Sequence, residues 1–303
     1  MSADGRIGVV YIAGIAYTGS TIIARSLAEC PGVFYGGELR QIWQRAIVEG
    51  RPCRCGHEVG DCPVWRSVLA GLPFDPYVEA AWLGAAHDRL MRPLPLARTL
   101  ARVRGGADTG PLDRYRAATA ELYRAIGAAT GRRIIIDSSK SAWYASLLAS
   151  IADLDLSIVH VIRDPRATVY SHLRRRRVGP VGITLQSRRW ARWHRAADRL
   201  ERLPNARYVR VRYEDFAEDP ACVLKSVGRV MGLAGADALV TDGVIRLTPK
   251  HFVGGNRSRA TTGDVTIRPD TEWEGALPSW TSRVVALTTL PTLVRSGYSP
   301  HVG

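Results

Sequence analysis

Residues 6–21 have the sequence RIGVVYIAGIAYTGST, in which an apolar, β-branched run is followed by a turn with two glycines and the start of a helical pattern. The run from Arg6 to Ala13 is typical of a buried strand, and Ser20–Glu29 is typical of a helix. A strand, a tight turn and a helix together present backbone N–H groups to a phosphate. This stretch therefore predicts an α/β fold with an anion-binding turn after its first strand.

Strand and helix patterns alternate along the rest of the chain, which indicates βαβ units. Further strands are predicted at Arg132–Asp137, Leu156–Arg163 and Tyr208–Tyr213, and further helices at Leu112–Thr130, Ala142–Ala152, Pro165–Arg176, Leu185–Leu203 and Asp219–Met231. The fold class that follows is α/β, with a P-loop-type, mainly parallel sheet flanked by helices. Without an internal repeat or a clear boundary, we expect one domain over residues 1–303, with helical and loop insertions at about 41–110. Within the insertions, Arg51–Asp75 is expected to be a surface loop and Arg92–Gly110 a mobile connection or lid.

The composition limits the class of protein. The 303 residues include 42 Lys+Arg and 28 Asp+Glu, for a net charge of +14, and 46% of them are hydrophobic, which argues against wholesale disorder. No apolar run approaches the roughly 18 residues that span a bilayer, and no secretory signal is visible, so we expect a cytoplasmic protein without a membrane anchor. The positive charge suggests an anionic ligand, a nucleic acid or an anionic membrane surface as partner.

The glycine-bearing turn departs from a nucleotidase loop at one position. A P-loop has the pattern GxxxxGK[ST], whereas residues 14–21 have Ser20 in place of the lysine. That lysine contacts the β- and γ-phosphates, so its absence argues against ATP or GTP hydrolysis. The remaining turn suits a single phosphate, although an ordinary turn with small residues would have the same sequence. Its candidate binding residues are Tyr17, Thr18, Gly19, Ser20 and Thr21.

A second anion site is predicted where HVIRDPR, residues 160–166, ends a strand and begins a helix. Asp164 suits the helix cap and Pro165 its first turn. Arg163 then lies at the carboxyl end of the strand, where open α/β sheets bind ligands. Ser171 and Arg175 share one face of the helix at i, i+4. Two arginines and a hydroxyl make a suitable receptor for a phosphate dianion.

These motifs together resemble those of sulfotransferases that use 3′-phosphoadenosine 5′-phosphosulfate (PAPS), in the bacterial branch related to the tyrosylprotein and carbohydrate enzymes. Residues 14–23 resemble the family's 5′-phosphosulfate loop, and residues 160–175 its 3′-phosphate motif with Arg163, Ser171 and Arg175. Tyr213, in VRYEDF, is similar to a tyrosine near the nucleotide. The segment HFVGGNRSR, residues 251–259, followed by Gly263, Asp270 and Trp273, resembles the C-terminal loop over the cofactor, which implies nucleotide contacts from Asn256, Arg257 and Arg259.

The resemblance implies transfer of a sulfuryl group from PAPS to a hydroxyl of a small molecule, such as a bacterial natural product, glycoside, nucleoside or lipid. It implies that Glu38, in GGELR, is the general base; a structural Glu38 paired with Arg40 is the alternative. Lys140, in DSSK, is expected to stabilise the leaving oxygen, with Asp137 orienting it, unless it is simply solvated beside a helix cap. Relatives carry Arg or Lys at the position of Tyr17, so Lys140 or Arg40 is expected to supply that charge. The reaction leaves adenosine 3′,5′-bisphosphate as product and requires no metal.

Cys53, Cys55, His57 and Cys62 are four possible zinc ligands within ten residues. Their spacing is not that of a common zinc finger or ribbon, so we expect reduced thiols or a disulfide here and assign no metal site, with a structural zinc ion as the alternative that the sequence leaves open. Among the other histidines, His160 is expected to be a satisfied core residue, whereas His172 and His194 have no recognisable partner.

Two other functions remain open at this point. One is a P-loop-like kinase acting on a small molecule, which Ser20 in place of lysine argues against. The other is a nucleic-acid or membrane-surface binding protein, which the net charge allows but which lacks the basic–aromatic pattern of nucleic-acid binders. We therefore expect a hydroxylated small molecule and no nucleic acid as partner. The sequence leaves the acceptor and the oligomeric state open.

Overall fold

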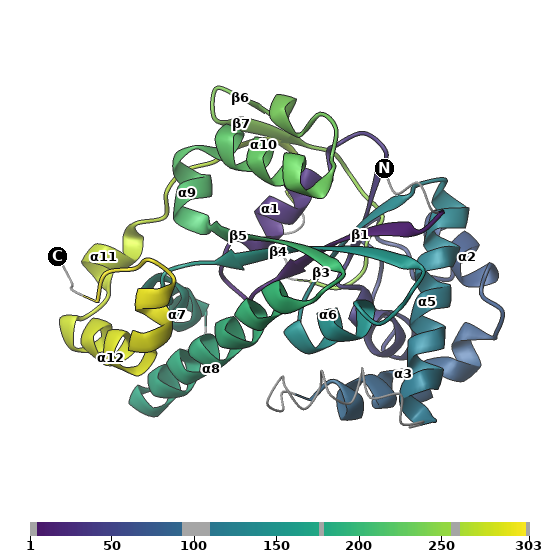
Figure 1. The fold of residues 1–303 in the computed structure, drawn as a ribbon, viewed down its shortest axis with the longest axis horizontal. Coiled ribbons are helices and arrows are strands. Elements are labelled where there is room, and N and C mark those ends of the chain that lie inside the picture. Colours follow the sequence, from purple (N-terminus) through teal and green to yellow (C-terminus); the bar gives the residue numbers. More distant parts are fainter. Residues whose placement is uncertain (1–4, 93–109, 176–178, 256–260, 301–303) are drawn as a thin grey trace.

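A five-stranded parallel sheet forms the centre of the molecule (Figure 1). The computed structural model describes residues 5–92, 110–175, 179–255 and 261–300. The strands follow the spatial order β2-β3-β1-β4-β5, and each neighbouring pair is parallel. Their bounds are β1 (Ile7–Ala13), β2 (Val33–Gly37), β3 (Ile134–Lys140), β4 (Leu154–Ile162) and β5 (Ala206–Arg212).

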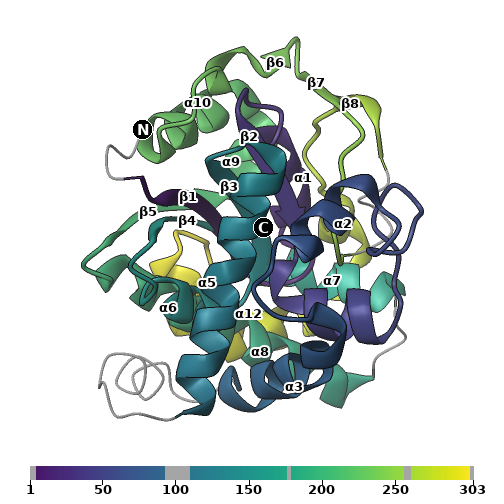
Figure 2. The same ribbon diagram turned by 90° about the vertical axis from the view of Figure 1, so that its right-hand side faces the viewer.

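Helices cover both faces of the sheet (Figure 1). The helices α1 (Ser20–Leu27) and α10 (Pro220–Met231) pack on one face, and α5 (Pro111–Thr130) and α6 (Ala142–Leu148) on the other. Near α5 lie α2 (Pro63–Ala70) and α3 (Pro76–Leu90); Figure 1 shows the three helices at one end of the sheet, and Figure 2 shows them from that side. At the other end, α7 (Pro165–Arg175), α8 (Pro180–Asp198) and α12 (Ser279–Arg295) pack together. Short helices are α9 (Tyr213–Glu218) and α11 (Glu272–Ala276).

The side-chain alternation of β1 explains why the sheet needs both layers. Val9 and Tyr11 belong to the core beneath α5 and α6, whereas Val10 and Ile12 belong to the core beneath α1 and α10. Successive residues of a strand point to opposite faces, so a continuous apolar run is buried only between two helical layers. The sequence prediction of a mainly parallel α/β sheet flanked by helices is confirmed.

Several elements differ from the sequence prediction. The edge strand β2 was not among the predicted strands, nor was a small antiparallel sheet of β6 (Val240–Thr241), β7 (Val244–Leu247) and β8 (Gly263–Thr266). The prediction of a surface loop over Arg51–Asp75 is wrong, because this stretch contains α2 and buries Cys53 and Cys62. The segment expected to be a lid lies, except at its ends, outside the described residues.

Further helix boundaries shift as well. Helix α8 begins at Pro180, five residues before its predicted start, because a proline suits the first turn of a helix. Helix α12 was missed altogether, because it contains Pro291 and several threonines, which weaken the helical signal. No helix among the described residues is long and apolar enough to cross a membrane.

Candidate functional site

Every strand of the parallel sheet ends beside a residue that the sequence singled out. In spatial order, β2 is followed by Glu38, β3 ends on Lys140, β1 leads into residues 14–21, β4 is followed by Arg163, and β5 by Tyr213. The carboxyl ends of parallel strands meet at one edge, which is where α/β sheets bind ligands. The strand order therefore gathers residues that are up to 199 positions apart in the chain at a single edge.

The turn at residues 14–19 is built for close approach. Gly14 has φ 149°, and a Cβ there would lie 2.6 Å from the carbonyl oxygen of Val161. Gly19 has φ 76° and would place a Cβ 2.1 Å from Cδ2 of Tyr213. Thr18 is buried and donates a hydrogen bond through Oγ1 to the Ile15 carbonyl at 2.8 Å, which holds the turn closed. Gly19 is the N-cap of α1 and offers no side-chain cap, so the first N–H groups of the helix face outward.

A cavity of about 210 Å³ lies over this helix start. Its lining includes Tyr17, Ser20, Thr21 and Lys140, as the sequence suggested, and also Arg25, which the sequence analysis missed. Arg25 follows Thr21 by four residues and therefore shares its face of α1. Its guanidinium donates to the carbonyl oxygens of Thr261 and Thr248, at 3.2 Å for the latter. The i, i+4 spacing from Thr21 was the signal that could have revealed it.

A neighbouring cavity of about 480 Å³ contains the second predicted anion site. Arg163 and Ser171 line it, together with Tyr17, Gly19 and Tyr213. Tyr17 and Gly19 therefore border both cavities. The two stretches that the sequence singled out, residues 14–21 and Arg163 with Ser171, thus lie at the ends of the neighbouring strands β1 and β4.

Arg163 is held by three groups. Its Nη1 donates to the Tyr17 carbonyl at 3.4 Å, its Nη2 lies 2.9 Å from Oδ2 of Asp270, and its guanidinium packs 4.6 Å above the ring of Tyr213. Its Nε is buried and has no hydrogen-bond partner among the described residues. The side chain is thus aimed into the cavity with donor capacity remaining, since a guanidinium has five N–H groups.

The helix after Arg163 is capped as predicted, and Arg174 is among the described residues that line the cavity. Asp164 accepts a hydrogen bond from the N–H of Arg166 at 2.7 Å, which caps α7. Arg174 lines the cavity beside Ser171 and pairs with Glu272. The predicted Arg175 lies at the end of α7, and its side chain is outside the described part of the chain. The predicted Asn256, Arg257 and Arg259 also lie outside the described residues.

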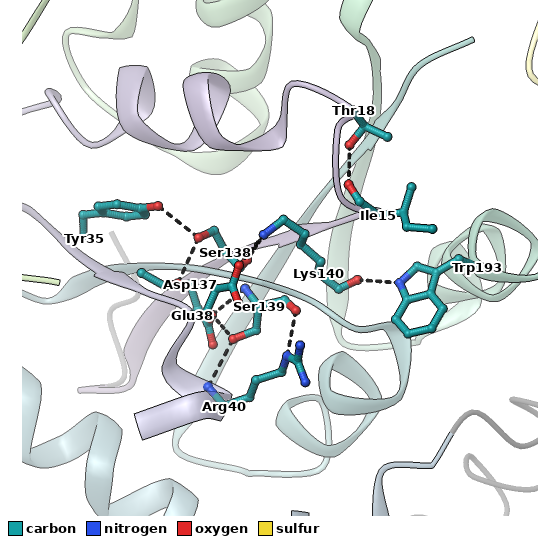
Figure 3. A network of polar contacts seen from close by, with 11 residues as sticks. Ile15, Thr18, Tyr35, Glu38, Arg40, Asp137, Ser138, Ser139, Lys140 and Trp193 are labelled. Atoms are coloured by element: carbon teal, nitrogen blue, oxygen red, sulfur yellow. Dashed lines mark hydrogen bonds and ion pairs between the residues drawn. The ribbon is translucent and has the colours of Figure 1, made fainter. Parts of the chain in front are cut away.

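Glu38 and Lys140 form an ion pair at the ends of β2 and β3 (Figure 3). Nζ of Lys140 lies 2.6 Å from Oε1 of Glu38 and also donates to the Ser138 carbonyl at 3.2 Å. Both side chains are largely buried, with 13% and 11% of their surface exposed. Lys140 has φ 68°, a region that non-glycine residues rarely adopt, and its carbonyl accepts hydrogen bonds from Gly14 N–H and Trp193 Nε1. This backbone geometry turns Lys140 toward Glu38, so the paired arrangement has a structural cause.

Asp137 and Arg40 have other roles than the sequence suggested. Asp137 accepts hydrogen bonds from Ser139 and Tyr123, at 2.8 Å from the Ser139 N–H and 2.6 Å from the Tyr123 hydroxyl, and it does not orient Lys140. Burial raises the pKa of Asp137 to about 6. Arg40 donates through Nε to the Ser139 carbonyl at 3.0 Å and contacts His87 at 3.4 Å, away from the residues that line the two cavities (Figure 3). Lys140, and not Arg40, is therefore the predicted cation that reaches the turn.

Of the three histidines considered in the sequence, His160 and His194 lie together in the core, and His172 lies beside Tyr17. His160 is fully buried and hydrogen bonded to Tyr208 and His194, both at 2.7 Å, which agrees with a core role. His194 thus has a partner that the sequence did not reveal, because the pairing joins a strand to a distant helix. Burial lowers the pKa of both histidines, so the pair stays neutral. The ring of His172 packs edge-on against Tyr17, 4.4 Å between centroids, at the border of the site.

A larger cavity of about 780 Å³ adjoins the Arg163 cavity and shares Tyr213 and Asp270 with it. A second and larger cavity therefore lies next to the one that Arg163 lines. A separate hollow of about 380 Å³, lined by Arg6, Leu154 and Asn205, lies at the opposite, amino ends of the strands. That position is the wrong edge for a ligand in this type of sheet.

The sequence profile of the sulfotransferase family matches residues 84–237, which is about half of the chain. This match contains Lys140, Arg163, Ser171 and Tyr213. The chain belongs to the sulfotransferase family. The protein is therefore a sulfotransferase enzyme.

Comparison with solved structures agrees with this assignment at the level of the fold. The sulfotransferase domain of the Synechococcus PCC 7002 olefin synthase is 22% identical and superposes with a TM-score of 0.51 over 99% of this chain and 98% of its own. The sulfotransferase STF9 from Mycobacterium avium is 15% identical, with a TM-score of 0.42 over 78% of this chain and 67% of its own. A search of curated proteins finds no significant match.

Proposed function

We propose that this sulfotransferase transfers a sulfuryl group from PAPS to a hydroxyl of a small-molecule acceptor. The observation that carries the proposal is the pair of anion-binding cavities at the neighbouring ends of β1 and β4, which share Tyr17 and Gly19. Two such sites suit a ligand with phosphate groups at two ends. We further propose that the whole chain is one sulfotransferase domain, with the acceptor side formed by segments within residues 41–110.

The residues present fit such a nucleotide. The α1 start with Gly19, Ser20 and Thr21 suits the 5′-phosphosulfate, because backbone N–H groups and the helix dipole favour an anion. Arg163, with its unpartnered Nε, and Ser171 suit the 3′-phosphate. When bound, PAPS supplies an activated sulfuryl group and a phosphate leaving group.

Glu38 and Lys140 suit two steps of the reaction, which are removal of the acceptor proton and stabilisation of the leaving oxygen. A carboxylate at Glu38 accepts the proton of an acceptor hydroxyl, and the ammonium of Lys140 donates a hydrogen bond to the oxygen that gains negative charge as the bond to sulfur breaks. Their separation of 2.6 Å keeps the two charges balanced in a largely buried place. Asp270, by contrast, faces Arg163 and has no role near the transferred group.

Ligand specificity tests the proposal directly. Thermal unfolding is measured with adenosine 3′,5′-bisphosphate, with ATP–Mg²⁺ and with duplex DNA. The bisphosphate at about 100 times its dissociation constant should add about 2.7 kcal/mol to the free energy of unfolding, and the other two should add none. Stabilisation by ATP–Mg²⁺ alone would favour a kinase, and stabilisation by DNA alone a nucleic-acid binder. Mass spectrometry of acceptors for the gain of one SO₃ group tests the transfer itself.

The first prediction separates the two phosphate sites. Arg163→Lys should weaken binding of adenosine 3′,5′-bisphosphate by about tenfold or more, because lysine lacks the planar fork of donors. Binding of adenosine 5′-phosphate, which lacks the 3′ group, should stay within about twofold of the wild type. Isothermal titration with both nucleotides measures the two affinities. Equal losses for both would contradict the assignment of Arg163 to the 3′-phosphate.

The second prediction concerns the base. Glu38→Gln should lower kcat by about 10²–10⁴-fold, because glutamine cannot accept the hydroxyl proton. Bisphosphate affinity should be kept, since Glu38 lies at β2, outside the two anion cavities. The readouts are turnover under saturating donor and titration with the bisphosphate. Near-normal turnover in a folded variant would remove Glu38 as the base.

A further inference from the structure

Three cysteines and one histidine form a compact cluster outside the sulfotransferase site. They are Cys53, Cys55, Cys62 and His251, and their four donor atoms all lie within 4.8 Å of one another. Sγ of Cys62 is 3.2 Å from Nδ1 of His251. Each of the three cysteines is a free thiol. His57, which the sequence grouped with these cysteines, has an exposed side chain and is not part of the cluster.

The donor set and its dimensions suit zinc. Structural zinc sites are four-coordinate and tetrahedral, and Cys₃His is one of their common ligand sets. A tetrahedron with Zn–S bonds of about 2.3 Å has sulfur atoms about 3.8 Å apart, which is inside the observed limit. Cys53 and Cys62 are buried, whereas Cys55 and His251 are half-buried, so the cluster is shielded yet reachable from solvent.

Backbone hydrogen bonds fix the conformation of the loop around the cluster. The Cys53 N–H donates to the His57 carbonyl at 2.8 Å, and the Gly56 N–H donates to the Cys53 carbonyl at 2.9 Å. Gly56 has φ 93°, which lets the chain reverse directly after Cys55. Cys62 is the N-cap residue of α2, directly before its first turn. The loop therefore holds three sulfur atoms on the side where His251 approaches.

We propose that Cys53, Cys55, Cys62 and His251 bind one structural zinc ion. Binding displaces the three thiol protons to solvent and leaves all four positions of the metal occupied by protein. The site is therefore closed and has no position for a substrate.

The zinc ion would fasten the C-terminal segment to the edge of the sheet that carries Glu38. Beside His251, Phe252 accepts a hydrogen bond from the Arg54 N–H at 3.0 Å. Val253 then pairs with the end of β2: its N–H donates to the Gly36 carbonyl at 3.1 Å, and its carbonyl accepts from the Glu38 N–H at 2.9 Å. A metal at His251 thus restrains the backbone on which Glu38 is held, without contacting the reacting groups.

Metal analysis of untagged, reduced protein tests the proposal. Elemental mass spectrometry should find about one zinc ion per chain. Cys62→Ser and His251→Gln should each weaken zinc binding by more than about 100-fold. The matched controls His57→Gln, in the same loop, and Cys222→Ser, an exposed free thiol elsewhere, should retain zinc. Loss in His57→Gln with retention in His251→Gln would overturn the ligand set.

A measurement on the wild type tests the proposal even if the variants fail to fold. Removal of zinc by a chelator under reducing conditions should lower the thermal midpoint by about 5 °C or more, and added zinc should restore it. Cobalt added to the metal-free protein should give thiolate-to-metal charge-transfer bands of a tetrahedral site. Less than about one-tenth of an equivalent of zinc after growth with added zinc, and no stabilisation by zinc, would overturn the proposal. An intact mass lower by two hydrogen atoms would instead show a disulfide and also overturn it.

Discussion

Gly19 occupies the tightest point of the anion site, where the turn after β1 meets Tyr213. It adopts φ 76°, which favours glycine, and a Cβ would overlap the tyrosine ring at 2.1 Å. The same absence of a side chain lets the N–H groups of α1 face the cavity. One residue therefore serves the backbone turn, the contact with Tyr213 at the start of α9 and the proposed anion site.

Gly32 offers a matched control for this position. It has φ 77°, yet a Cβ there would meet nothing within 4 Å. Gly32→Ala should lower the free energy of unfolding by about 1–2 kcal/mol through its backbone alone. Gly19→Ala should cost about 1–3 kcal/mol more because of the overlap, and only this variant should lose bisphosphate binding. Urea unfolding and titration measure both effects; equal stabilities for the two variants would contradict the prediction.

At the scale of elements, the sequence revealed the strands that carry strong apolar runs and the residues directly after them. Arg163 and Tyr213 could be placed at strand ends because the parallel α/β pattern defines the edge on which they lie. The strand β2 was not among the predicted strands, since VFYGG combines a short apolar run with two glycines. His251 could not be assigned to the cysteine cluster, because it lies 189 residues from Cys62 and is brought to it by long-range backbone pairing, through Val253 to the end of β2 and through Phe252 to Arg54.

The segment after β8 forms one wall of the arginine pocket through Asp270. Its carboxylate lies 2.9 Å from Nη2 of Arg163, with 6% of the arginine side chain and 37% of the aspartate side chain exposed. If Arg163 holds the 3′-phosphate, as proposed, that phosphate competes with this carboxylate for the same guanidinium. Nucleotide binding would then weaken the contact of this segment with Arg163, and the contact would weaken nucleotide binding by the same factor.

Asp270→Asn tests this coupling. The variant should bind adenosine 3′,5′-bisphosphate about three to ten times more tightly, since a partly exposed ion pair is worth about 1 kcal/mol. Asp264→Asn, an exposed residue of β8, changes the net charge equally and should alter the affinity by less than about twofold. Titration at one fixed salt concentration compares the two variants. Weaker binding by Asp270→Asn would show that the carboxylate supports the bound state instead.

At the scale of the whole molecule, three buried histidines govern the response to acid. Burial, with Arg40 adding to it, lowers the pKa of His87 to about 3; burial and Arg210 lower the pKa of His194 to about 3, and burial lowers that of His160 as well. The unfolded chain takes up protons at these positions below about pH 6.5, while the folded chain does not. Stability due to the three histidines is therefore complete above pH 6.5 and is lost as the pH falls toward 3.

Two buried carboxyls, Asp137 and Asp198, partly offset this loss of stability in acid. Burial raises the pKa of Asp137 to about 6 and also raises that of Asp198, so the folded chain holds protons there that the unfolded chain has released. The net effect near pH 5 is a loss of about 1–3 kcal/mol of stability per pH unit of acidification. Urea unfolding between pH 5 and 7 measures the slope, and His87→Gln should reduce it by about one proton. A stability that stays flat over this range would contradict the prediction.

The contact between Glu38 and Lys140 also bears on how the enzyme treats its costly activated donor. While the carboxylate accepts from the ammonium at 2.6 Å, that oxygen is already engaged with a proton donor and is a poor activator of a passing water molecule. If Glu38 is the base and Lys140 stabilises the leaving oxygen, as proposed, an acceptor alcohol that inserts between them would separate the two groups and free each for its own step. The donor would thus be spared from wasteful hydrolysis until a proper acceptor arrives, so selectivity against water would come from the resting state of the enzyme itself.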